Sequence, residues 1–273
     1  MNELSKYILK KDSIFMPYIS LGDPSYDLSI KWAEAISPNC DILELGIPFS
    51  DPVADGPVIQ KSYKRALDNQ IFSMETILET TKKIYEIIQK PIVYITYLNP
   101  VISYGLENFF KNAYNSGVRG IVIPDLPFDT KEYLSIFTIS QKNNISIINL
   151  ITPASSKERI KSMKKYSTGF IYYVTSFGVT GSRSDFDSKI EERIKMVKDV
   201  LKIPVFAGFG ISEAEQAKKI SAYSDGIIIG SKIQKIIEEE SKDPTLCSLK
   251  LSQYTQEIKN SLIVKKNRNY ENG

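Results

Sequence analysis

Residues 41–56 read Asp-Ile-Leu-Glu-Leu-Gly-Ile-Pro-Phe-Ser-Asp-Pro-Val-Ala-Asp-Gly, a stretch that begins as an apolar run and ends as an acidic loop. The apolar run predicts a buried strand at residues 42–47. Both loop aspartates precede a proline or a glycine, which is typical of turns. Glu44 is different, because an unpaired carboxylate inside an apolar run costs roughly several kcal/mol. We therefore expect the chain to hold Glu44 and Asp55 across a small-molecule pocket.

The order of an apolar run followed by a helical stripe repeats along the whole chain. Apolar runs bounded by turn residues predict eight strands, and the spacing between them predicts about eight amphipathic helices. The predicted strands cover residues 14–21, 42–47, 92–97, 120–125, 145–151, 169–174, 204–207 and 225–229. This alternation fits a parallel (β/α)8 TIM barrel with extra terminal helices. An open Rossmann-like sheet is the alternative, but no Gly-x-Gly-x-x-Gly follows the first strand.

Capping residues and changes of composition predict where helices begin and where the domain ends. Ser73 is expected to cap one helix, and Ser155 and Ser212 each begin a Ser-x-x-Glu capping box that is expected to open another. No linker or change of composition divides the chain, so we expect one barrel domain over residues 1–264. Residues 265–273 are expected to form a polar, frayed tail.

Composition narrows the possible functions. Of 273 residues, 42% are hydrophobic, and the net charge of +3 does not favour a nucleic-acid or membrane surface. The chain has no histidine, which excludes a Ser-His-Asp triad and histidine-ligated zinc. Cys40 and Cys247 are expected to be free thiols in a reducing compartment. Without a long apolar run or a signal-peptide pattern, we expect a bacterial cytosolic protein, or a plastid stromal one if it is organelle-encoded.

Glycine-rich loops follow the sixth, seventh and eighth predicted strands. They contain residues 178–181, 208–210 and 230–231. Glycines let backbone N–H groups approach an anion, and a helix that starts near Ser231 directs its positive end toward it. We expect a phosphate site of main-chain donors, with hydroxyl groups from Thr180 and Ser231. The alternative is that these glycines only shape tight turns.

Strand parity assigns roles to the acids. Glu44 shares a face of its strand with Ile42 and Gly46, while Leu43 and Leu45 share the face that packs against helices. Glu44 is therefore expected to point into the barrel mouth, where desolvation raises its pKa. Asp55, on a loop over the mouth, is expected to ionise more easily, so the two carboxylates can divide acid and base roles.

Several motifs resemble the family of tryptophan synthase α subunits. They are Leu-Gly-Asp-Pro at residues 21–24, Leu-Glu-Leu-Gly-Ile-Pro-Phe-Ser-Asp-Pro-Val-Ala-Asp-Gly-Pro at 43–57, and the later Gly-Val-Thr-Gly, Gly-Phe-Gly-Ile and Gly-Ser segments. The resemblance covers about residues 15–231, and it implies a single barrel. It also implies the retro-aldol cleavage of indole-3-glycerol phosphate to indole and glyceraldehyde 3-phosphate without a metal or organic cofactor. Indole then passes to a β subunit in an α2β2 tetramer.

The resemblance implies roles by motif position. Glu44 corresponds to the general acid–base residue and Asp55 to the carboxylate that takes or stabilises the indole N–H proton. The remaining positions are the substrate-pocket residues Tyr18, Ile95, Asn99, Val122 and Tyr172, the phosphate-binding residues Thr180, Gly181, Gly210, Gly230 and Ser231, and the partner-interface residues Pro48, Asp51 and Pro52.

Three positions depart from the family pattern. Tyr18 stands where the family often has Phe, Ser20 where Thr is frequent, and Pro124 where Ala is frequent. The pocket wall is therefore expected to be slightly more polar, and the partners of Asp55 are expected to differ.

Other functions remain open at this point. The chain could be a different phosphate-binding barrel enzyme, or a weakly active subunit that mainly activates its partner. The absence of histidine weighs against a triosephosphate-isomerase-like enzyme. The absence of lysine from residues 15–20, 92–97 and 120–125 weighs against a lysine-dependent indole-glycerol phosphate synthase.

Overall fold

Parallel strands form one continuous sheet at the centre of the molecule. The computed structural model describes residues 1–69, 71–174, 183–208, 210–264 and 270. The strands are β1 (Ile14–Ser20), β2 (Leu43–Gly46), β3 (Ile92–Ile95), β4 (Val118–Val122), β5 (Ser146–Ile147), β6 (Asn149–Ile151), β7 (Ile171–Val174), β8 (Val205–Gly208) and β9 (Gly226–Ile229). Their order in the sheet is β5-β4-β3-β2-β1-β9-β8-β7-β6, and every pairing is parallel.

The sheet closes through the predicted fifth strand, which is split in two. β5 pairs with β4, and β6 pairs with β7. Ile148 is the single residue between the two halves, and its N–H donates to the Ile121 carbonyl at 2.8 Å. One stretch of chain therefore joins both edges of the sheet. The predicted barrel is confirmed, with its eight strands counted as nine because of this break.

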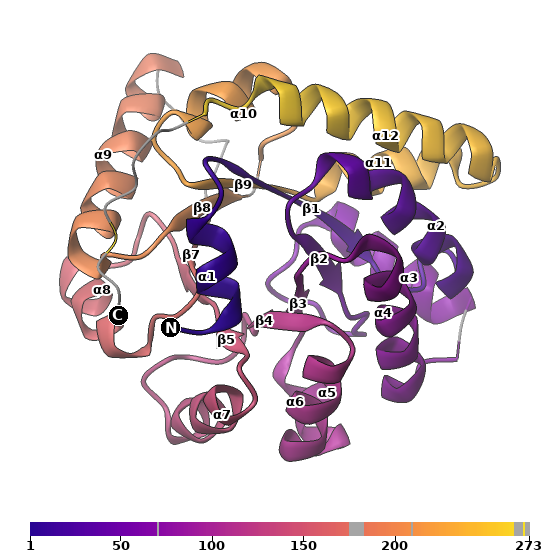
Figure 1. Ribbon diagram of the computed structural model, residues 1–273, viewed down its shortest axis with the longest axis horizontal. Helices are drawn as coiled ribbons and strands as arrows, with labels where there is room; N and C mark the ends of the chain where they lie inside the picture. Colours follow the sequence, from indigo (N-terminus) through magenta and orange to yellow (C-terminus); the bar gives the residue numbers. More distant parts are fainter. Residues whose placement is uncertain (70, 175–182, 209, 265–269, 271–273) are drawn as a thin grey trace.

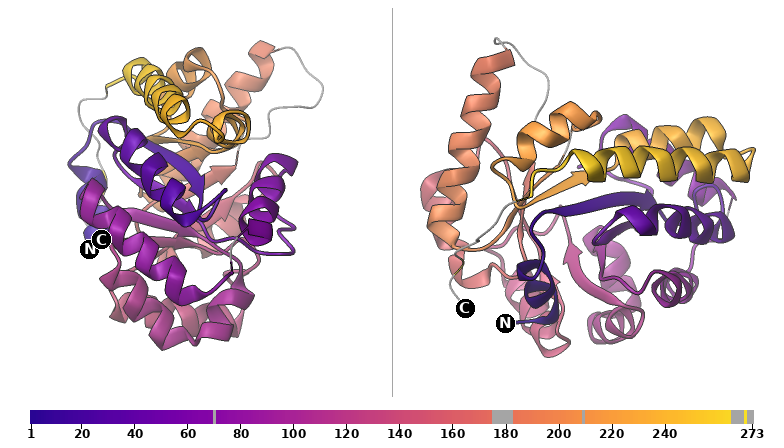
Figure 2. Two further views of the ribbon diagram at one scale, coloured as in Figure 1. Left: turned by 90° about the vertical axis from the view of Figure 1, so that its right-hand side faces the viewer. Right: turned by 45° about the horizontal axis from the view of Figure 1, so that its top comes forward.

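Helices surround the strands (Figure 1). They are α1 (Glu3–Leu9), α2 (Tyr26–Ile36), α3 (Pro57–Asn69), α4 (Met74–Ile88), α5 (Leu98–Tyr104), α6 (Leu106–Asn115), α7 (Lys131–Lys142), α8 (Lys157–Ser162), α9 (Arg183–Leu201), α10 (Ala214–Ser221), α11 (Ser231–Glu240) and α12 (Pro244–Ser261), with short 3-10 helices at Ser37–Asn39 and Lys164–Tyr166. The predicted extra terminal helices are α1 and α12. Figure 2 shows α12 running beside α11 on the outside of the sheet.

Two cores result from the alternation of side chains along the strands. The outer core lies between sheet and helices and contains Leu43 and Leu45. The inner core fills the barrel and contains Ile42, together with Leu4 and Ile8 of α1, which places α1 against the barrel interior. The predicted parity of β2 is therefore correct, and it leaves Glu44 on the inner side.

The helix starts agree with the sequence predictions less well than the strands do. Ser73 caps α4 as expected, since its hydroxyl accepts from the Thr76 N–H. Ser155 and Ser212 are wrong by one residue: the caps are Ser156 for α8 and Glu213 for α10. In α10 the capping box pairs Glu213 with Gln216, so the neighbouring polar residue satisfies the same exposed N–H groups.

We propose that residues 1–264 form one domain, because α12 packs against α2, α10 and α11 while its Lys259 pairs with the buried Asp41.

Of the predicted tail, the structure describes Tyr270, whose hydroxyl donates to Asp225. The other residues of the tail lie outside the described ranges. Within those ranges, no helix combines the length and apolar character needed to cross a membrane.

Candidate active site

Glu44 lies in the barrel mouth on β2. Its side chain is 1% exposed, and its Oε1 atom has no hydrogen-bond partner among the described residues. Burial, followed by the negative charge of Asp55, raises the pKa of Glu44 to about 8. The carboxyl group is therefore mostly protonated at neutral pH and can donate a proton there.

Asp55 reaches the same space from the loop between β2 and α3. Its Oδ2 atom accepts a hydrogen bond of 2.6 Å from the Tyr97 hydroxyl, which in turn accepts from the Ala54 N–H at 3.0 Å. Burial raises the pKa of Asp55, whereas the Tyr97 hydrogen bond opposes this rise by stabilising the carboxylate. Glu44 thus lacks a partner on one oxygen, while Asp55 has a donor that favours its ionised form.

Both acids line one cavity of about 160 Å³ at the C-terminal ends of the strands. In a barrel of this kind, this end carries the chemistry. The lining residues are Tyr18, Glu44, Asp55, Ile59, Ile95, Tyr172, Gly210, Ile211, Ser212, Ile228, Gly230 and Ser231. The cavity wall is therefore mainly apolar and aromatic, with the two acidic residues among its lining.

The start of α11 supplies the polar end of the cavity. Gly230 is the N-cap of this helix and makes no side-chain cap hydrogen bond. The first N–H groups of the helix are consequently uncapped by a side chain, which is the arrangement that binds phosphate. Gly210 and Ser231 lie beside them in the lining, while the predicted Thr180 and Gly181 lie outside the described residues.

The structure places the other predicted residues as follows. Asn99 is exposed in the first turn of α5, and Val122 on β4 belongs to the inner core; neither is among the described residues that line the cavity. On the loop after β2, Pro48 is buried, Pro52 is half-buried and Asp51 is exposed. These roles stay predictions.

Sequence reasoning missed several residues of the site. Tyr97 is the most important of them, because it holds Asp55 and stacks on Phe49 with ring centroids 5.0 Å apart. A signal existed: Tyr97 has the same parity as Val93 and Ile95, and all three belong to the inner core. Ile228 follows from parity as well, whereas Ile59 and Ile211 lie in segments without such a pattern.

These features define a class of protein. A parallel barrel with a helix N-terminus and two carboxylates of unlike environment at its mouth is typical of a phosphate-binding barrel enzyme that works by acid–base catalysis. No group of three or more metal-ligating side chains occurs in the described part of the chain.

Comparisons with known proteins identify the family. The model of the tryptophan synthase alpha chain family matches residues 4–263. A tryptophan synthase alpha chain from Leptospira interrogans is 53% identical over 96% of this chain and its own full length, and one from Halalkalibacterium halodurans is 39% identical over 89% and 92%. The chain belongs to the tryptophan synthase alpha chain family, whose members cleave indole-3-glycerol phosphate in tryptophan biosynthesis.

Solved structures of tryptophan synthase alpha chains have the same fold as this chain. Tryptophan synthase subunit alpha from Legionella pneumophila superposes with a TM-score of 0.83 at 28% identity and covers 96% of this chain and 98% of its own. A chain from the tryptophan synthase α2β2 complex of Pyrococcus furiosus, described in a study of mutual activation, has a TM-score of 0.81 at 33% identity, with coverages of 91% and 98%. The fold resemblance therefore spans nearly the whole chain.

The buried carboxyl group of Glu44 should make stability depend on pH. Well below pH 4.5 it is protonated in both folded and unfolded chains. As the pH rises from about 4.5 toward 8, mainly the unfolded chain ionises, so stability falls. Glu44→Gln should remove up to about 5 kcal/mol of this loss. Urea unfolding at pH 5 and pH 9 measures it, with Glu34→Gln on the exposed face of α2 as control. Equal pH dependence in both variants would contradict the burial argument.

Proposed function

We propose that Glu44 and Asp55 perform the acid–base steps by which this chain cleaves indole-3-glycerol phosphate to indole and glyceraldehyde 3-phosphate. This proposal rests mainly on Glu44, whose buried Oε1 atom is unpartnered among the described residues and whose side chain lines the same cavity as Asp55. With a pKa near 8, Glu44 exchanges its proton readily near neutral pH.

The steps balance with these two groups alone. Protonated Glu44 donates to indole C3, and the resulting carboxylate accepts the proton of the hydroxyl group on the adjacent glycerol carbon. The bond between this carbon and C3 then breaks, the carbon becomes the aldehyde, and indole leaves. Asp55 takes or stabilises the indole N–H proton while positive charge develops on the ring nitrogen. Its ionised form, favoured by Tyr97, suits this role.

Binding divides between the two ends of the cavity. We assign the phosphate to the N-terminus of α11 with Gly210, Gly230 and Ser231, to which Thr180 and Gly181 are added by motif position. The indole ring lies between Tyr18, Ile95 and Tyr172, with Val122 and Asn99 contributing at the edge of the site. This orientation brings the C3–carbon bond between the two carboxylates.

Glu44→Gln should abolish indole release, with a fall in kcat of at least about 100-fold, because the amide cannot transfer the proton. Substrate binding should persist, since the substitution conserves shape. Indole formation and equilibrium binding of the substrate measure the two effects, with Glu34→Gln as the exposed control. A Glu44→Gln enzyme with near-normal turnover would refute the acid–base assignment.

Tyr97→Phe tests the positioning of Asp55. It removes the hydroxyl donor and retains the ring that stacks on Phe49. Without this donor the pKa of Asp55 should rise, so activity should fail at a higher pH on the acid side, and kcat/KM should fall about tenfold.

The pH profile of kcat/KM separates this role from a loss of stability. Tyr133→Phe, which removes a buried hydroxyl bonded to Asn149 away from the mouth, is the control. An unshifted profile for Tyr97→Phe would mean that the hydrogen bond does not tune Asp55.

The tryptophan synthase of Pyrococcus furiosus is an α2β2 complex. We also propose that this chain contacts a β subunit in such a complex and that it does so through the loop after β2. Asp51 is exposed on it beside Val53, whose side chain is 82% exposed, while Pro48 and Pro52 stiffen the loop. Closure of this loop moves Asp55, which couples partner binding to catalysis. Since the Leptospira and Halalkalibacterium relatives are bacterial, we propose that the complex works in the bacterial cytosol.

A cognate β subunit should accelerate indole formation by roughly 5- to 150-fold, the usual range of coupling between sites. Asp51→Asn should reduce this ratio, whereas Asp68→Asn at the far end of α3 should not. Steady-state rates with and without partner measure the effect. Equal ratios for wild type and Asp51→Asn would exclude Asp51 from the coupling.

A further inference from the structure

Tyr18 stands between the acidic and the phosphate-binding sides of the mouth. β1 lies between β2 and β9, with Tyr18 directly opposite Glu44 and Pro17 opposite Ile229. The ring of Tyr18 fills the gap over two glycines. A Cβ atom on Gly46 would lie 2.2 Å from the Tyr18 hydroxyl, and one on Gly230 would lie 3.2 Å from its ring. The ring is thus set against backbone on both sides.

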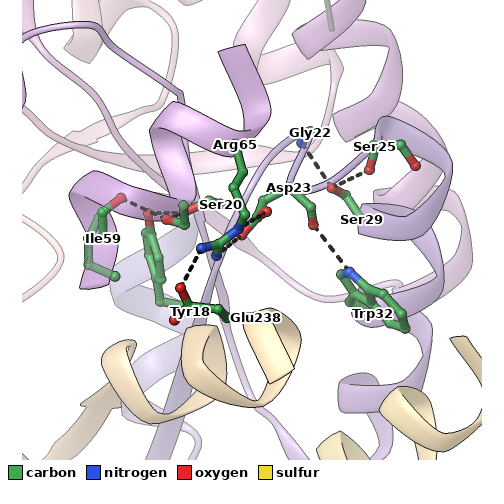
Figure 3. A network of polar contacts seen from close by, with 11 residues as sticks. Tyr18, Ser20, Gly22, Asp23, Ser25, Ser29, Trp32, Ile59, Arg65 and Glu238 are labelled. Atoms are coloured by element: carbon green, nitrogen blue, oxygen red, sulfur yellow. Dashed lines mark hydrogen bonds and ion pairs between the residues drawn. The ribbon is translucent and has the colours of Figure 1, made fainter. Parts of the chain in front are cut away.

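A chain of buried hydroxyl groups fixes the end of this ring. Tyr18 Oη lies 2.7 Å from Ser20 Oγ, which lies 2.6 Å from Ser62 Oγ, and Ser62 donates to the Ile59 carbonyl at 2.7 Å (Figure 3). A carbonyl only accepts, so the single proton of Ser62 is committed to Ile59. Ser20 must then donate to Ser62, and Tyr18 must donate to Ser20.

This order of donors determines what Tyr18 can do. Its hydroxyl proton is directed away from the cavity toward Ser20, so it is not available to either carboxylate or to a substrate. Burial raises the pKa of Tyr18 well above its usual value, and the charges of Asp55 and Glu44 raise it further. The phenol therefore stays neutral, and toward the cavity it contributes shape rather than a proton.

Further buried hydrogen bonds hold the backbone next to this hydroxyl chain in place. Gln234, with its amide oriented to satisfy both groups, accepts from the Ser20 N–H at 2.8 Å and donates to Asp23 Oδ2 at 2.9 Å. Arg65 binds both oxygens of Asp23, at 2.9 and 2.8 Å, and also reaches Glu238 at 3.1 Å (Figure 3). Ser20 and Ser62 are 1% and 0% exposed, so moving the phenol would take its buried O–H away from its acceptor and remove the donor to Ser20.

We propose that Tyr18 is a specificity-determining residue that limits the size of the aromatic ring admitted to the mouth. Held by Ser20 and Ser62, it cannot retreat, so it admits an unsubstituted indole ring and excludes rings enlarged by a methyl group on the side that faces Tyr18. This inference rests on the proposed cleavage of an indole substrate and adds a selection step to it. Removal of the hydroxyl lets the ring move into the vacated space, which is about the size of a methyl group.

The test compares wild type, Tyr18→Phe and Tyr94→Phe. Tyr94 is a matched control, because its buried hydroxyl also donates to a hydroxyl, that of Thr81, but lies in the outer core. Each protein is assayed with indole-3-glycerol phosphate and its singly ring-methylated analogues. Binding of an indole with a 3-propyl phosphate chain, which lacks the cleavable bond, is measured by calorimetry with and without the same methyl groups.

We expect Tyr18→Phe to raise kcat/KM for at least one methylated substrate, relative to the parent, by about tenfold, the lower range for one methyl group in an apolar pocket. The binding ratio of the uncleavable probes should change likewise, while the pH profile for the parent substrate should stay as in wild type. Tyr94→Phe should change neither ratio.

The proposal is overturned if Tyr18→Phe and Tyr94→Phe show the same ratio of methylated to parent compound, both in binding and in turnover. A shifted pH profile in Tyr18→Phe also overturns it, because the phenol would then take part in the chemistry. If wild type binds the probes without cleaving the substrate, the proposed function fails, while the binding ratios still decide the role of Tyr18.

Discussion

The structure depends on the closure of the parallel sheet by one stretch of chain that pairs on both sides. Ser146 and Ile147 continue the sheet from β4, and Asn149–Ile151 continue it toward β7. Closure removes both sheet edges and brings the C-terminal ends of all strands into one ring. Glu44 on β2 and Tyr172 on β7 come from strands that do not pair with each other, and closure of the ring lets both line one cavity.

Inside the barrel, burial of the Glu44 carboxyl group raises its pKa. The inner core excludes water around Glu44, and the described residues leave one of its oxygens without a partner. The same desolvation that destabilises the ionised form holds the pKa near 8, where the group can both give and take a proton. Asp55 differs from Glu44 because the Tyr97 hydroxyl donates a hydrogen bond to it, which opposes the rise of its pKa by burial. Two chemically similar side chains thus have different surroundings, one with an unpartnered oxygen among the described residues and one with a hydroxyl donor.

The polar groups beneath the barrel mouth fix the positions of the surrounding elements. The hydroxyl chain from Tyr18 to Ile59 and the pairing of Asp23 with Arg65 connect β1 to α3 and α11. α3 follows the loop that carries Asp55, and α11 presents its N-terminus to the cavity. A shift of either helix would break buried hydrogen bonds, so these contacts hold α3 and the N-terminus of α11 in place relative to β1.

The barrel, the parity of β2 and the family could be predicted from the sequence, because hydrophobic periodicity and the motif at residues 43–57 are local patterns. This parity placed Glu44 on the inner face correctly. Three features follow only from the folded structure: Tyr97 holds Asp55, Ser62 directs the proton of Tyr18, and the helix caps fall at Ser156 and Glu213. These are contacts between segments far apart in sequence, or choices between adjacent polar residues of nearly equal propensity, and no local pattern distinguishes them.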